Sequence, residues 1–309
     1  MDTSNKLAPI VLFVYNRLDY TKKTIEALQT NQLASESILF IYSDAAKDEN
    51  DAHRVSQVRE YIKTIDGFKS VIISKRENNW GLADSIIDGV SEVVEKYGKI
   101  IVLEDDLVTS PSFLKFTNEA LDFYEDHKKV WHISGWNYPI ETTRLEDVFL
   151  WRCMSCWGWA TWSDRWEYFE KNIDKTMKDF SRKQIKYFNL DNYENYWSQI
   201  IANKENKINT WAVFWYATII KHKGLCLNPA HSFVINIGND GSGEHRDSSN
   251  TFLTTLSKTN KFNFTSDFQE NLIAVDLIKK FYKSIKTPLL IRITNKFKRM
   301  LNKTIKSLS

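Results

Sequence analysis

The sequence has little of the residues that build linkers, cross-links and membrane spans. It contains 10 glycines, 5 prolines and 3 cysteines in 309 residues. So little glycine and proline excludes collagen-like and linker-rich architectures, and three cysteines cannot form a disulfide framework. No run of 18 apolar residues occurs, so the sequence predicts no membrane-spanning segment. The polar start, residues 1–7, lacks the apolar stretch of a signal peptide. These absences together predict a cytoplasmic protein in a reducing compartment.

Three familiar site signatures are also missing. Neither the G-x-G-x-x-G pattern after the first strand nor a P-loop motif occurs, which disfavours a dinucleotide enzyme or a P-loop NTPase. Cys153 and Cys156 have C-x-x-C spacing, but no second pair or nearby histidine completes a tetrahedral zinc site. We therefore expect the cysteines to be buried thiols.

Acidic residues are absent from the C-terminal end. Residues 279–309 contain ten Lys and Arg and no Asp or Glu, which leaves 32 basic and 39 acidic residues in the remainder. From residue 285 onward, apolar residues recur at every fourth position: Leu289, Ile293, Phe297, Leu301 and Ile305. This pattern favours a cationic amphipathic helix on an anionic membrane surface, at the inner face of the cell membrane. A docked helix with solvated charges and a nucleic-acid-binding tail are the alternatives. We expect no nucleic-acid partner, because a lipid-linked acceptor would explain the basic tail.

The hydrophobic content of 42% and charged content of 26% are those of a globular protein with a sizeable core. Short apolar runs alternate with helical patterns over the first hundred residues. The predicted strands are 9–15, 37–43, 68–74 and 99–103, and the predicted helices are 19–31, 53–64 and 82–97, with Asp19 as a helix cap. This alternation predicts an α/β fold with a mostly parallel central sheet flanked by helices.

Polar clusters follow each of the four predicted strands. They are Asn16–Arg17, Asp44, Asn78–Gly81 and Glu104–Asp106. The carboxyl ends of parallel strands lie along one edge of the sheet, which is where open α/β sheets bind ligands. The sequence therefore predicts a single polar site at this edge.

Glu104, Asp105 and Asp106 form the most informative of these clusters. Three consecutive carboxylates after a buried strand repel one another unless a cation compensates their charge. Mg²⁺ or Mn²⁺ with a diphosphate as a further ligand would do so, because such ions take one or two carboxylates plus phosphate oxygens. The alternative is that the acids are solvated and cap a helix that starts near residues 110–111.

Several segments together carry a family resemblance over residues 8–245. They are Pro9–Arg17 (PIVLFVYNR), Ser43–Asp44, Val102–Asp106 (VLEDD), Val130–Asn137 (VWHISGWN) and Trp151–Trp159 (WRCMSCWGW). In order and spacing they resemble N-acetylglucosaminyltransferase I and bacterial glycosyltransferases of capsule and lipopolysaccharide synthesis. That resemblance implies a GT-A fold, in which an acidic motif ends a middle strand of a nucleotide-sugar-binding sheet.

The resemblance implies roles for the polar residues at the strand ends. Arg17 would contact the nucleotide, and Asp44 would accept a hydrogen bond from the uracil imide. Asp105 would lie near the ribose, Asp106 would bind the metal, and Glu104 would lie near the donor sugar and diphosphate. For Arg17 or Asp44 alone, a surface residue at a strand end is the simpler interpretation, and only their shared edge favours a site.

Further residues are assigned to the donor and the acceptor. Asn16, Asn79 and Trp80 belong to the same predicted donor site. In the glycine-rich stretch 236–246, backbone N–H groups and His245 would close over the diphosphate.

Trp157 and Trp159 are candidates for the apolar floor of an acceptor sugar site, although this aromatic segment could equally serve as core. The sequence thus predicts one domain over residues 1–270 and a basic helical tail over residues 271–309. Within the domain, residues 1–107 would bind the nucleotide and residues 108–270 the acceptor.

The catalytic base is the one departure from the resembled pattern. The family carries an aspartate directly after a tryptophan, whereas here Ala212 follows Trp211. Asp240 and Glu244 are the nearest candidates in sequence order, together with Asp164. The reaction could also be a retaining one that needs no such base.

The sequence thus predicts a metal-dependent hexosyl- or N-acetylhexosaminyltransferase with Mn²⁺ or Mg²⁺ as cofactor. It would move a sugar from a nucleotide sugar, UDP-linked by expectation, to a glycan or lipid-linked glycan in surface polysaccharide synthesis. One alternative is a nucleotidyltransferase, which would need a glycine-rich loop where residues 16–19 stand. Another is a non-catalytic carbohydrate-binding or scaffold protein, an alternative that Ala212 keeps open.

Overall fold

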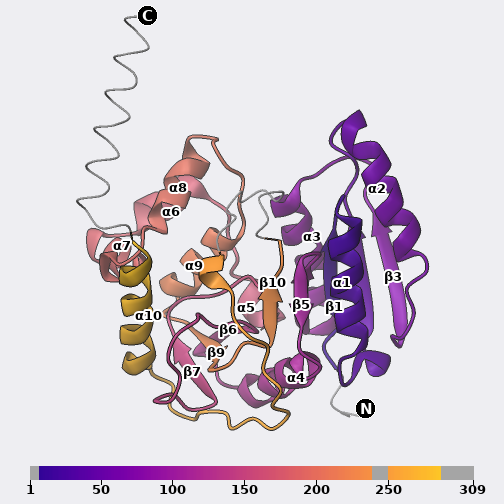
Figure 1. Cartoon of the computed structure of the whole chain (residues 1–309). Helices are drawn as coiled ribbons and strands as arrows, with labels where there is room; N and C mark the ends of the chain where they lie inside the picture. The colour runs from indigo at the N-terminus through magenta and orange to yellow at the C-terminus, as the bar shows by residue number, and fades with distance from the viewer. Residues whose placement is uncertain (1–6, 239–249, 287–309) are drawn as a thin grey trace, which may run out of the picture.

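An eight-stranded sheet in the order β3–β2–β1–β4–β8–β6–β9–β7 organises the molecule (Figure 1). The computed structural model describes residues 7–238 and 250–286. The strands are β1 (Ile10–Val14), β2 (Ile38–Ser43), β3 (Ser70–Lys75), β4 (Lys99–Glu104), β6 (Val130–Ser134), β7 (Val148–Trp151), β8 (Trp159–Trp162) and β9 (Leu225–Pro229). Strands β3, β2, β1 and β4 are parallel neighbours, β8 is antiparallel to both β4 and β6, and β6 is parallel to β9. The predicted α/β fold with a mostly parallel sheet is therefore confirmed.

Helices cover both faces of this sheet. Side chains alternate between the faces of a strand, so in β1 Ile10 and Leu12 pack in one cluster while Val11 and Phe13 pack in another. The first cluster is closed by α1 (Leu18–Gln29), α2 (Glu49–Ile62) and α4 (Phe113–Tyr124). The second is closed by α3 (Leu82–Tyr97), α5 (Ser163–Trp166) and α9 (Ala212–Lys221). Burial on both faces explains why β1 reads as an uninterrupted apolar run.

The second half of the chain adds a third core cluster. It lies among β7 and the helices α6 (Ile173–Asp179), α7 (Arg182–Phe188), α8 (Trp197–Lys204), α9 and α10 (Leu272–Ile285). Helix α10 buries Ala274, Val275 and Ile278 in it, and the Tyr282 hydroxyl donates to Tyr138 at 3.1 Å. Residues 272–285 of the expected tail are thus packed into the core. The apolar repeat from residue 289 lies outside the described residues.

Local differences from the predicted elements have local causes. Helix α2 begins at Glu49, four residues before the prediction, because the Asp48 carboxylate caps it by accepting from the Asn50 and Asp51 N–H groups at 2.9 and 3.1 Å. The prediction that Asp19 caps α1 is wrong, because α1 starts at Leu18 and Asp19 lies in its first turn. Helix α3 has the predicted bounds, and Gly98, with φ +81°, ends it.

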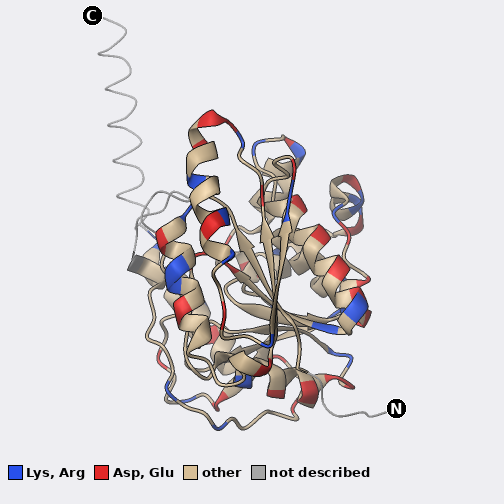
Figure 2. Ribbon diagram, turned by 90° about the vertical axis from the view of Figure 1, so that its right-hand side faces the viewer, with Lys and Arg blue, Asp and Glu red and all other residues tan. Residues whose placement is uncertain are grey.

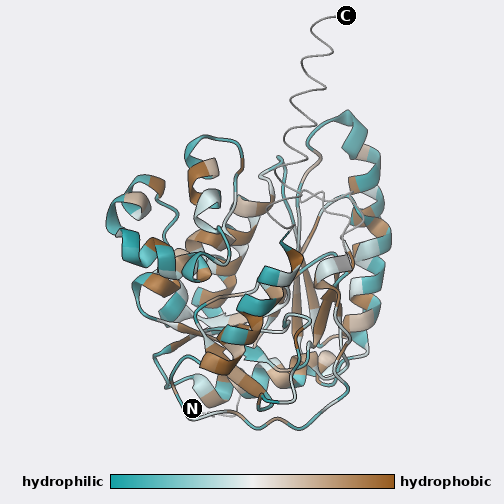
Figure 3. Cartoon of the chain, turned by 60° about the vertical axis from the view of Figure 1, so that its left-hand side comes forward, coloured by the Kyte–Doolittle hydropathy of each residue, from teal (hydrophilic) through white to brown (hydrophobic). Residues whose placement is uncertain are grey.

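Charge and hydropathy follow this layered arrangement. Charged residues lie mainly on helices and loops around an almost uncharged sheet (Figure 2). Hydrophobic residues lie on the strands and on parts of the helices (Figure 3). Among the described residues, no helix combines the length and apolar character needed to cross a membrane. The three cysteines are all free. Cys153 and Cys226 are buried, as expected of packed thiols, whereas Cys156 is partly exposed and differs from that expectation.

Candidate functional site

The acidic triplet lies in a tight turn that the sequence did not reveal. Strand β4 ends at Glu104, and after Asp105 and Asp106 the chain enters a short strand, β5 (Leu107–Thr109). Strand β5 pairs antiparallel with β10 (Val234–Asn236). Directly beyond this pair, the Ile237 N–H donates to the Asp106 carbonyl oxygen at 2.9 Å. The pairing therefore brings the start of the glycine-rich stretch against the acidic turn.

Asp106 is held by three segments of the chain. Its Oδ2 accepts from Arg17 Nη1 at 3.1 Å, and its Oδ1 accepts from the Asn236 amide at 3.2 Å. The other terminal nitrogen of Arg17 donates to the Gly238 carbonyl at 3.4 Å, and its guanidinium lies 3.8 Å from the centre of the Tyr20 ring. Only 16% of the Arg17 side chain and 18% of the Asp106 side chain are exposed. The predicted site residues Arg17 and Asp106 are thus in direct contact.

Glycine is required at position 238 for this arrangement. A Cβ on Gly238 would lie 2.1 Å from Asp106 Oδ2 and 2.9 Å from Arg17 Nη1, well inside contact distance. Any side chain at this position would displace the ion pair. The glycine-rich character of this stretch is therefore partly a packing requirement of the acidic site.

Asp105 occupies the inner side of the turn. Its Oδ2 accepts from the Tyr15 N–H at 3.4 Å, and the Thr24 hydroxyl donates to its carbonyl oxygen at 2.8 Å. Burial, followed by repulsion from Asp106, raises the pKa of Asp105 to about 7. Burial also raises the pKa of Asp106, although Arg17 opposes this change. Both shifts arise mainly from burial, so these carboxyl groups lie where water solvates a negative charge poorly.

A divalent cation fits this turn if the ligand shares in binding it. Within residues 7–238 and 250–286, no three His, Cys, Asp or Glu side chains are arranged to hold a metal by themselves. Mg²⁺ and Mn²⁺ commonly bind through one or two carboxylates plus phosphate oxygens. Asp106, with Asp105 and Glu104 beside it, supplies carboxylates of this kind, so the residues fit a cation that a diphosphate helps to coordinate.

Asp44 lies at the end of β2 and holds the neighbouring loop in place. Its two carboxylate oxygens accept from the N–H groups of Ala45 (2.9 Å), Trp80 (2.9 and 3.2 Å) and Gly81 (2.8 Å), and from the Asn79 amide (3.1 Å). A carboxylate offers about four lone-pair positions, and these donors use all of them. Asp44 therefore acts at least as a clamp of the loop after β3.

The clamped loop presents an indole at the sheet edge. Trp80 is 42% exposed, and the Arg76 guanidinium lies 4.0 Å from the centre of its ring. Asn79 uses its amide inside the loop, donating to the Ala45 carbonyl at 2.7 Å as well as to Asp44. Asn16, another predicted site residue, donates to Asp51 of α2 at 2.8 Å. These residues line the predicted edge, where Trp80 and Asn79 are exposed and Asn16 is partly exposed.

The two tryptophans predicted for the acceptor have different surroundings. Trp159 is 1% exposed and stacks between His132 at 5.3 Å and Trp211 at 5.1 Å, so core packing is the interpretation that fits it. Trp157 is partly exposed and meets Trp136 edge to face at 4.8 Å. Only Trp157 therefore retains surface for a ligand.

Strand β6 positions the loop that carries Trp157, which sequence reasoning missed. His132 Nε2 donates to the Ser155 carbonyl at 3.0 Å, while its Nδ1 accepts from the Trp215 indole at 3.2 Å. The Gly135 N–H donates to the Gly158 carbonyl at 2.6 Å. A histidine and a glycine among the aromatic residues of the V-W-H-I-S-G-W-N segment are the signal that could have indicated this clamp.

Of the candidates for the catalytic base, the structure describes only Asp164. Asp164 is not at the site, because β8 runs antiparallel to β4 with Trp162 opposite Lys99, at the far end of the sheet from the acidic turn. Its carboxylate pairs instead with Lys128 at 2.6 Å and Arg165 at 2.5 Å. Asp240, Glu244 and His245 lie outside the described residues.

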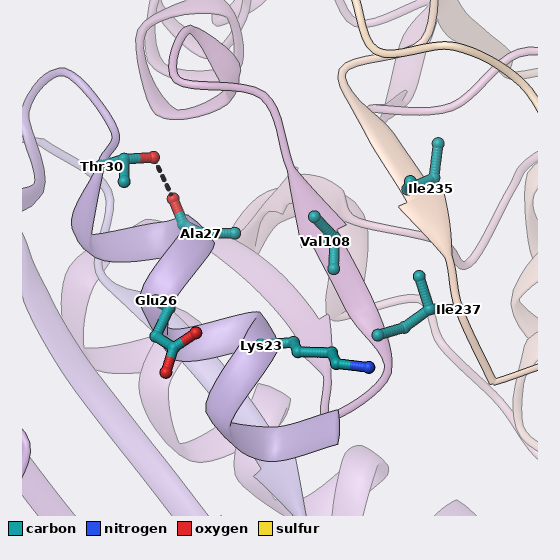
Figure 4. A pocket seen from close by; sticks show the side chains of 7 residues that line it. All are labelled: Lys23, Glu26, Ala27, Thr30, Val108, Ile235 and Ile237. Atoms are coloured by element: carbon teal, nitrogen blue, oxygen red, sulfur yellow. Dashed lines mark hydrogen bonds between the residues drawn. The ribbon is translucent and has the colours of Figure 1, made fainter. Parts of the chain in front are cut away.

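A separate groove lies beside the acidic turn, between α1 and the β5–β10 pair (Figure 4). Its volume is about 470 Å³, and it is lined by Lys23, Glu26, Ala27, Thr30, Val108, Ile235 and Ile237. Of the residues predicted for the donor or acceptor, only Ile237, from the glycine-rich stretch 236–246, lines this groove. The polar chemistry is thus concentrated at the sheet edge instead.

The order of the polar segments along this edge is matched by one protein family. The GNT-I family model matches residues 1–187, which include β1, the acidic turn and the aromatic loop. The chain belongs to the GNT-I family. The resemblance expected from the sequence is therefore confirmed, and with it the GT-A type of the α/β fold.

Individual relatives of this GNT-I family member are distant. An alpha-1,3-mannosyl-glycoprotein 2-beta-N-acetylglucosaminyltransferase of Arabidopsis thaliana is 24% identical over 145 residues, which cover 42% of this chain and 31% of that protein. The chain thus spans about a third of the length of this curated relative.

Two solved structures match the chain at low identity and low structural similarity. The mannosyltransferase PcManGT from Pyrobaculum calidifontis, in complex with GDP-Man and Mn²⁺, is 9% identical, with 71% of this chain and 70% of that chain covered and a TM-score of 0.38. S. aureus TarS 1-349 is 10% identical, with 73% of this chain and 59% of that chain covered and a TM-score of 0.39.

Proposed function

We propose that the chain is a metal-dependent glycosyltransferase that uses a nucleotide sugar, UDP-linked, and a glycan or lipid-linked glycan acceptor. Membership of the GNT-I family supports transfer of a hexosyl or N-acetylhexosaminyl group. The observation that carries the proposal is the convergence of Arg17, Asp106 and Gly238 on one buried, acid-rich turn. Surface polysaccharide synthesis is the process that a lipid-linked acceptor would serve.

Each side chain of the turn has a role that its chemistry allows. The planar guanidinium of Arg17 matches the oxygens of a diphosphate, and Asp106 would hold Mn²⁺ or Mg²⁺. When bound, the cation would offset the charge that develops on the departing diphosphate. Glu104 would lie beside the donor sugar and Asp105 beside the ribose.

The transfer exchanges one bond of the anomeric carbon for another. The acceptor hydroxyl oxygen bonds to that carbon, the bond from the carbon to the diphosphate breaks, and the hydroxyl proton passes to a base. Asp240 and Glu244 remain the candidates for this base, with His245 closing over the diphosphate. Trp157 would provide an apolar surface for the acceptor sugar, because exposed indoles pack well against sugar rings.

Recognition of the uracil ring of the nucleotide would take place beside Asp44. That carboxylate would accept from the uracil imide, with Asn16, Asn79 and Trp80 around it. Four donors already surround the Asp44 carboxylate. The uracil imide can therefore bind only if one of these donors shares a carboxylate oxygen with it.

We propose an anionic membrane surface, at the inner face of the cell membrane, as a further partner. The support is the run of ten basic and no acidic residues over 279–309. Lys and Arg near an anionic bilayer contribute about 1 kcal/mol each. Binding there would bring the enzyme to a lipid-linked acceptor.

The substitution Asp106→Asn tests the proposed activity. We expect the parent to release UDP from a UDP-sugar in the presence of Mn²⁺. The variant should lose this activity and bind UDP in Mn²⁺ at least about tenfold more weakly, under conditions where it is still fully folded. Calorimetric titration of UDP with and without Mn²⁺ measures the binding.

Asp126→Asn, in the exposed turn after α4, is the matched control and should behave as the parent. If Asp106→Asn keeps the parental Mn²⁺-dependent UDP affinity, the turn is not the metal site. If the parent binds UDP but releases none from any UDP-sugar, the chain is a non-catalytic carbohydrate-binding protein, as Ala212 in place of the family's aspartate would allow.

A further inference from the structure

We propose that Arg17 is an exchangeable counter-cation. In the absence of ligands it holds Asp106, and it passes to the diphosphate when a divalent cation takes its place on that carboxylate. This inference rests on the proposed function and adds a coupling between metal and nucleotide that is carried by one side chain. Arg17 is thus a positioning residue whose partner differs between the free and the donor-bound enzyme.

The first support is that both oxygens of Asp106 are in use. Oδ2 accepts from Arg17 and Oδ1 accepts from Asn236. These two donors occupy two of the about four lone-pair positions of the carboxylate, so a cation bound there would either lie beside the Arg17 guanidinium or take its place. Displacing Arg17 also removes a like charge from beside the metal, whereas displacing the neutral amide alone would leave two cations on one carboxylate.

The second support is that the contacts of the Arg17 backbone are separate from those of its guanidinium. Its carbonyl oxygen accepts from the Thr21 N–H and the Thr21 hydroxyl, both at 2.9 Å, which fixes the start of α1. The guanidinium, in contrast, lies between the Tyr20 ring at 3.8 Å and the Gly238 carbonyl at 3.4 Å. The head group can therefore change partner without movement of the sheet edge.

The third support is the match between guanidinium and phosphate. Two parallel N–H groups of arginine pair with two phosphate oxygens, so a diphosphate beside Asp106 gives Arg17 a partner as good as the one it leaves. Each ligand then favours the other: the cation frees Arg17 for the diphosphate, and the diphosphate draws Arg17 away from the cation's ligand. Such coupling is reciprocal between the two ligands.

Arg17→Gln tests the exchange through binding alone. We expect the variant to bind Mn²⁺ in the absence of nucleotide about tenfold more tightly than the parent, and to bind UDP in the absence of metal about tenfold more weakly. The factor by which Mn²⁺ tightens UDP binding should also shrink. Electron paramagnetic resonance of free Mn²⁺ and calorimetry of UDP provide these values.

Two further variants make the result specific. Arg54→Gln removes the same charge near the same edge, where Arg54 pairs with Asp51 on α2, and should leave both affinities at parental values. Arg17→Lys keeps the charge without the planar fork, so its Mn²⁺ affinity should lie between those of the parent and Arg17→Gln. A merely structural Arg17 would instead weaken both ligands together.

The outcomes separate this inference from the proposed function. If the parent binds Mn²⁺ through Asp106 but Arg17→Gln binds it no more tightly, the exchange is overturned and the metal site stands. If Mn²⁺ binds neither the parent nor any variant, even in the presence of UDP, both are overturned. Opposite changes for Mn²⁺ and UDP in Arg17→Gln support the exchange.

Discussion

Asp44 combines a predicted ligand role with an observed structural one. Its carboxylate accepts from the Trp80 and Gly81 N–H groups and from the Asn79 amide, all on the loop after β3. Removal of the carboxylate leaves these donors partly buried without an acceptor, at about 1–3 kcal/mol for such a group. The residue is therefore coupled to both stability and loop geometry.

We expect Asp44→Ala to lower the free energy of unfolding by about 2 kcal/mol and to weaken UDP at least about tenfold under conditions where the variant is fully folded. Urea denaturation gives the first value and calorimetry at low temperature the second. The base-recognition proposal requires the binding loss to exceed what partial unfolding explains. Parental UDP affinity in the folded variant would limit Asp44 to clamping the loop.

The sequence predicts which polar residues follow each strand, but it does not predict which residues they contact. Strand counting places Arg17, Asp44 and the acidic triplet on one edge, because parallel strands end together. The contact of Asn236 with Asp106 joins residues 130 positions apart. It depends on the three-residue strands β5 and β10, which are too short to show a period in the sequence.

At the scale of elements, β6 acts as a support for the aromatic loop. Its His132 is fully buried and bridges Trp215 and Ser155 through both ring nitrogens. Burial lowers the pKa of His132 to about 3, so the ring is neutral in the folded protein. In an unfolded chain the pKa of a histidine is about 6.5. Between pH 3 and pH 6.5, His132 is therefore neutral in the folded state and protonated in the unfolded state.

This difference predicts a pH-dependent stability. The folded pKa is below the unfolded one, so stability is complete above pH 6.5 and is lost as the pH falls toward 3. Each pH unit in that window should cost the parent about 1.4 kcal/mol more than His132→Gln, which cannot take up the proton. Urea denaturation at pH 7, 6 and 5 checks this.

His53→Gln, which alters an exposed histidine of α2, is the control and should keep the parental pH dependence. Parallel stability curves for the parent and His132→Gln would contradict the assignment. They would mean that His132 is charged in the folded state or titrates equally when unfolded.

At the scale of the whole molecule, α10 separates the core from the basic end. Ala274, Val275, Ile278 and Tyr282 pack against the second-half cluster, and Lys279 pairs with Asp191 at 2.7 Å. The described chain therefore contains a docked helix up to Ile285. A truncation after this helix leaves the described core contacts of α10 in the chain.

Deletion of residues 286–309 should abolish binding to anionic vesicles and leave turnover of a short soluble acceptor nearly unchanged. Turnover of a lipid-linked acceptor should fall. Because charge attraction is screened within about 8 Å at physiological salt, vesicle binding of the full chain should weaken as salt rises. Co-sedimentation with anionic and neutral vesicles at two salt concentrations measures this.

A different result would assign the segment differently. Loss of activity on both acceptors with a lower melting temperature would make it a docked structural element. Salt-insensitive binding, or none, would remove the membrane surface as a partner.

The sequence by itself determined the elements whose information is local. Apolar runs and helical periods gave the parallel half of the sheet, and the residues after each strand gave the polar edge. The ordered motifs gave the family. These features depend on residues that are neighbours in the chain, so one pass along it reveals them.

Only the tertiary structure decided which of these residues meet and which are free. Arg17 faces Asp106 because β1 lies beside β4. Asn236 reaches Asp106 because β10 pairs with β5. Trp159 is core because Trp211 covers it, and Asp164 lies at the opposite end because β8 reverses direction. The physical reason is that contact and burial depend on how distant segments pack. The local pattern of polar and apolar residues does not encode that packing directly.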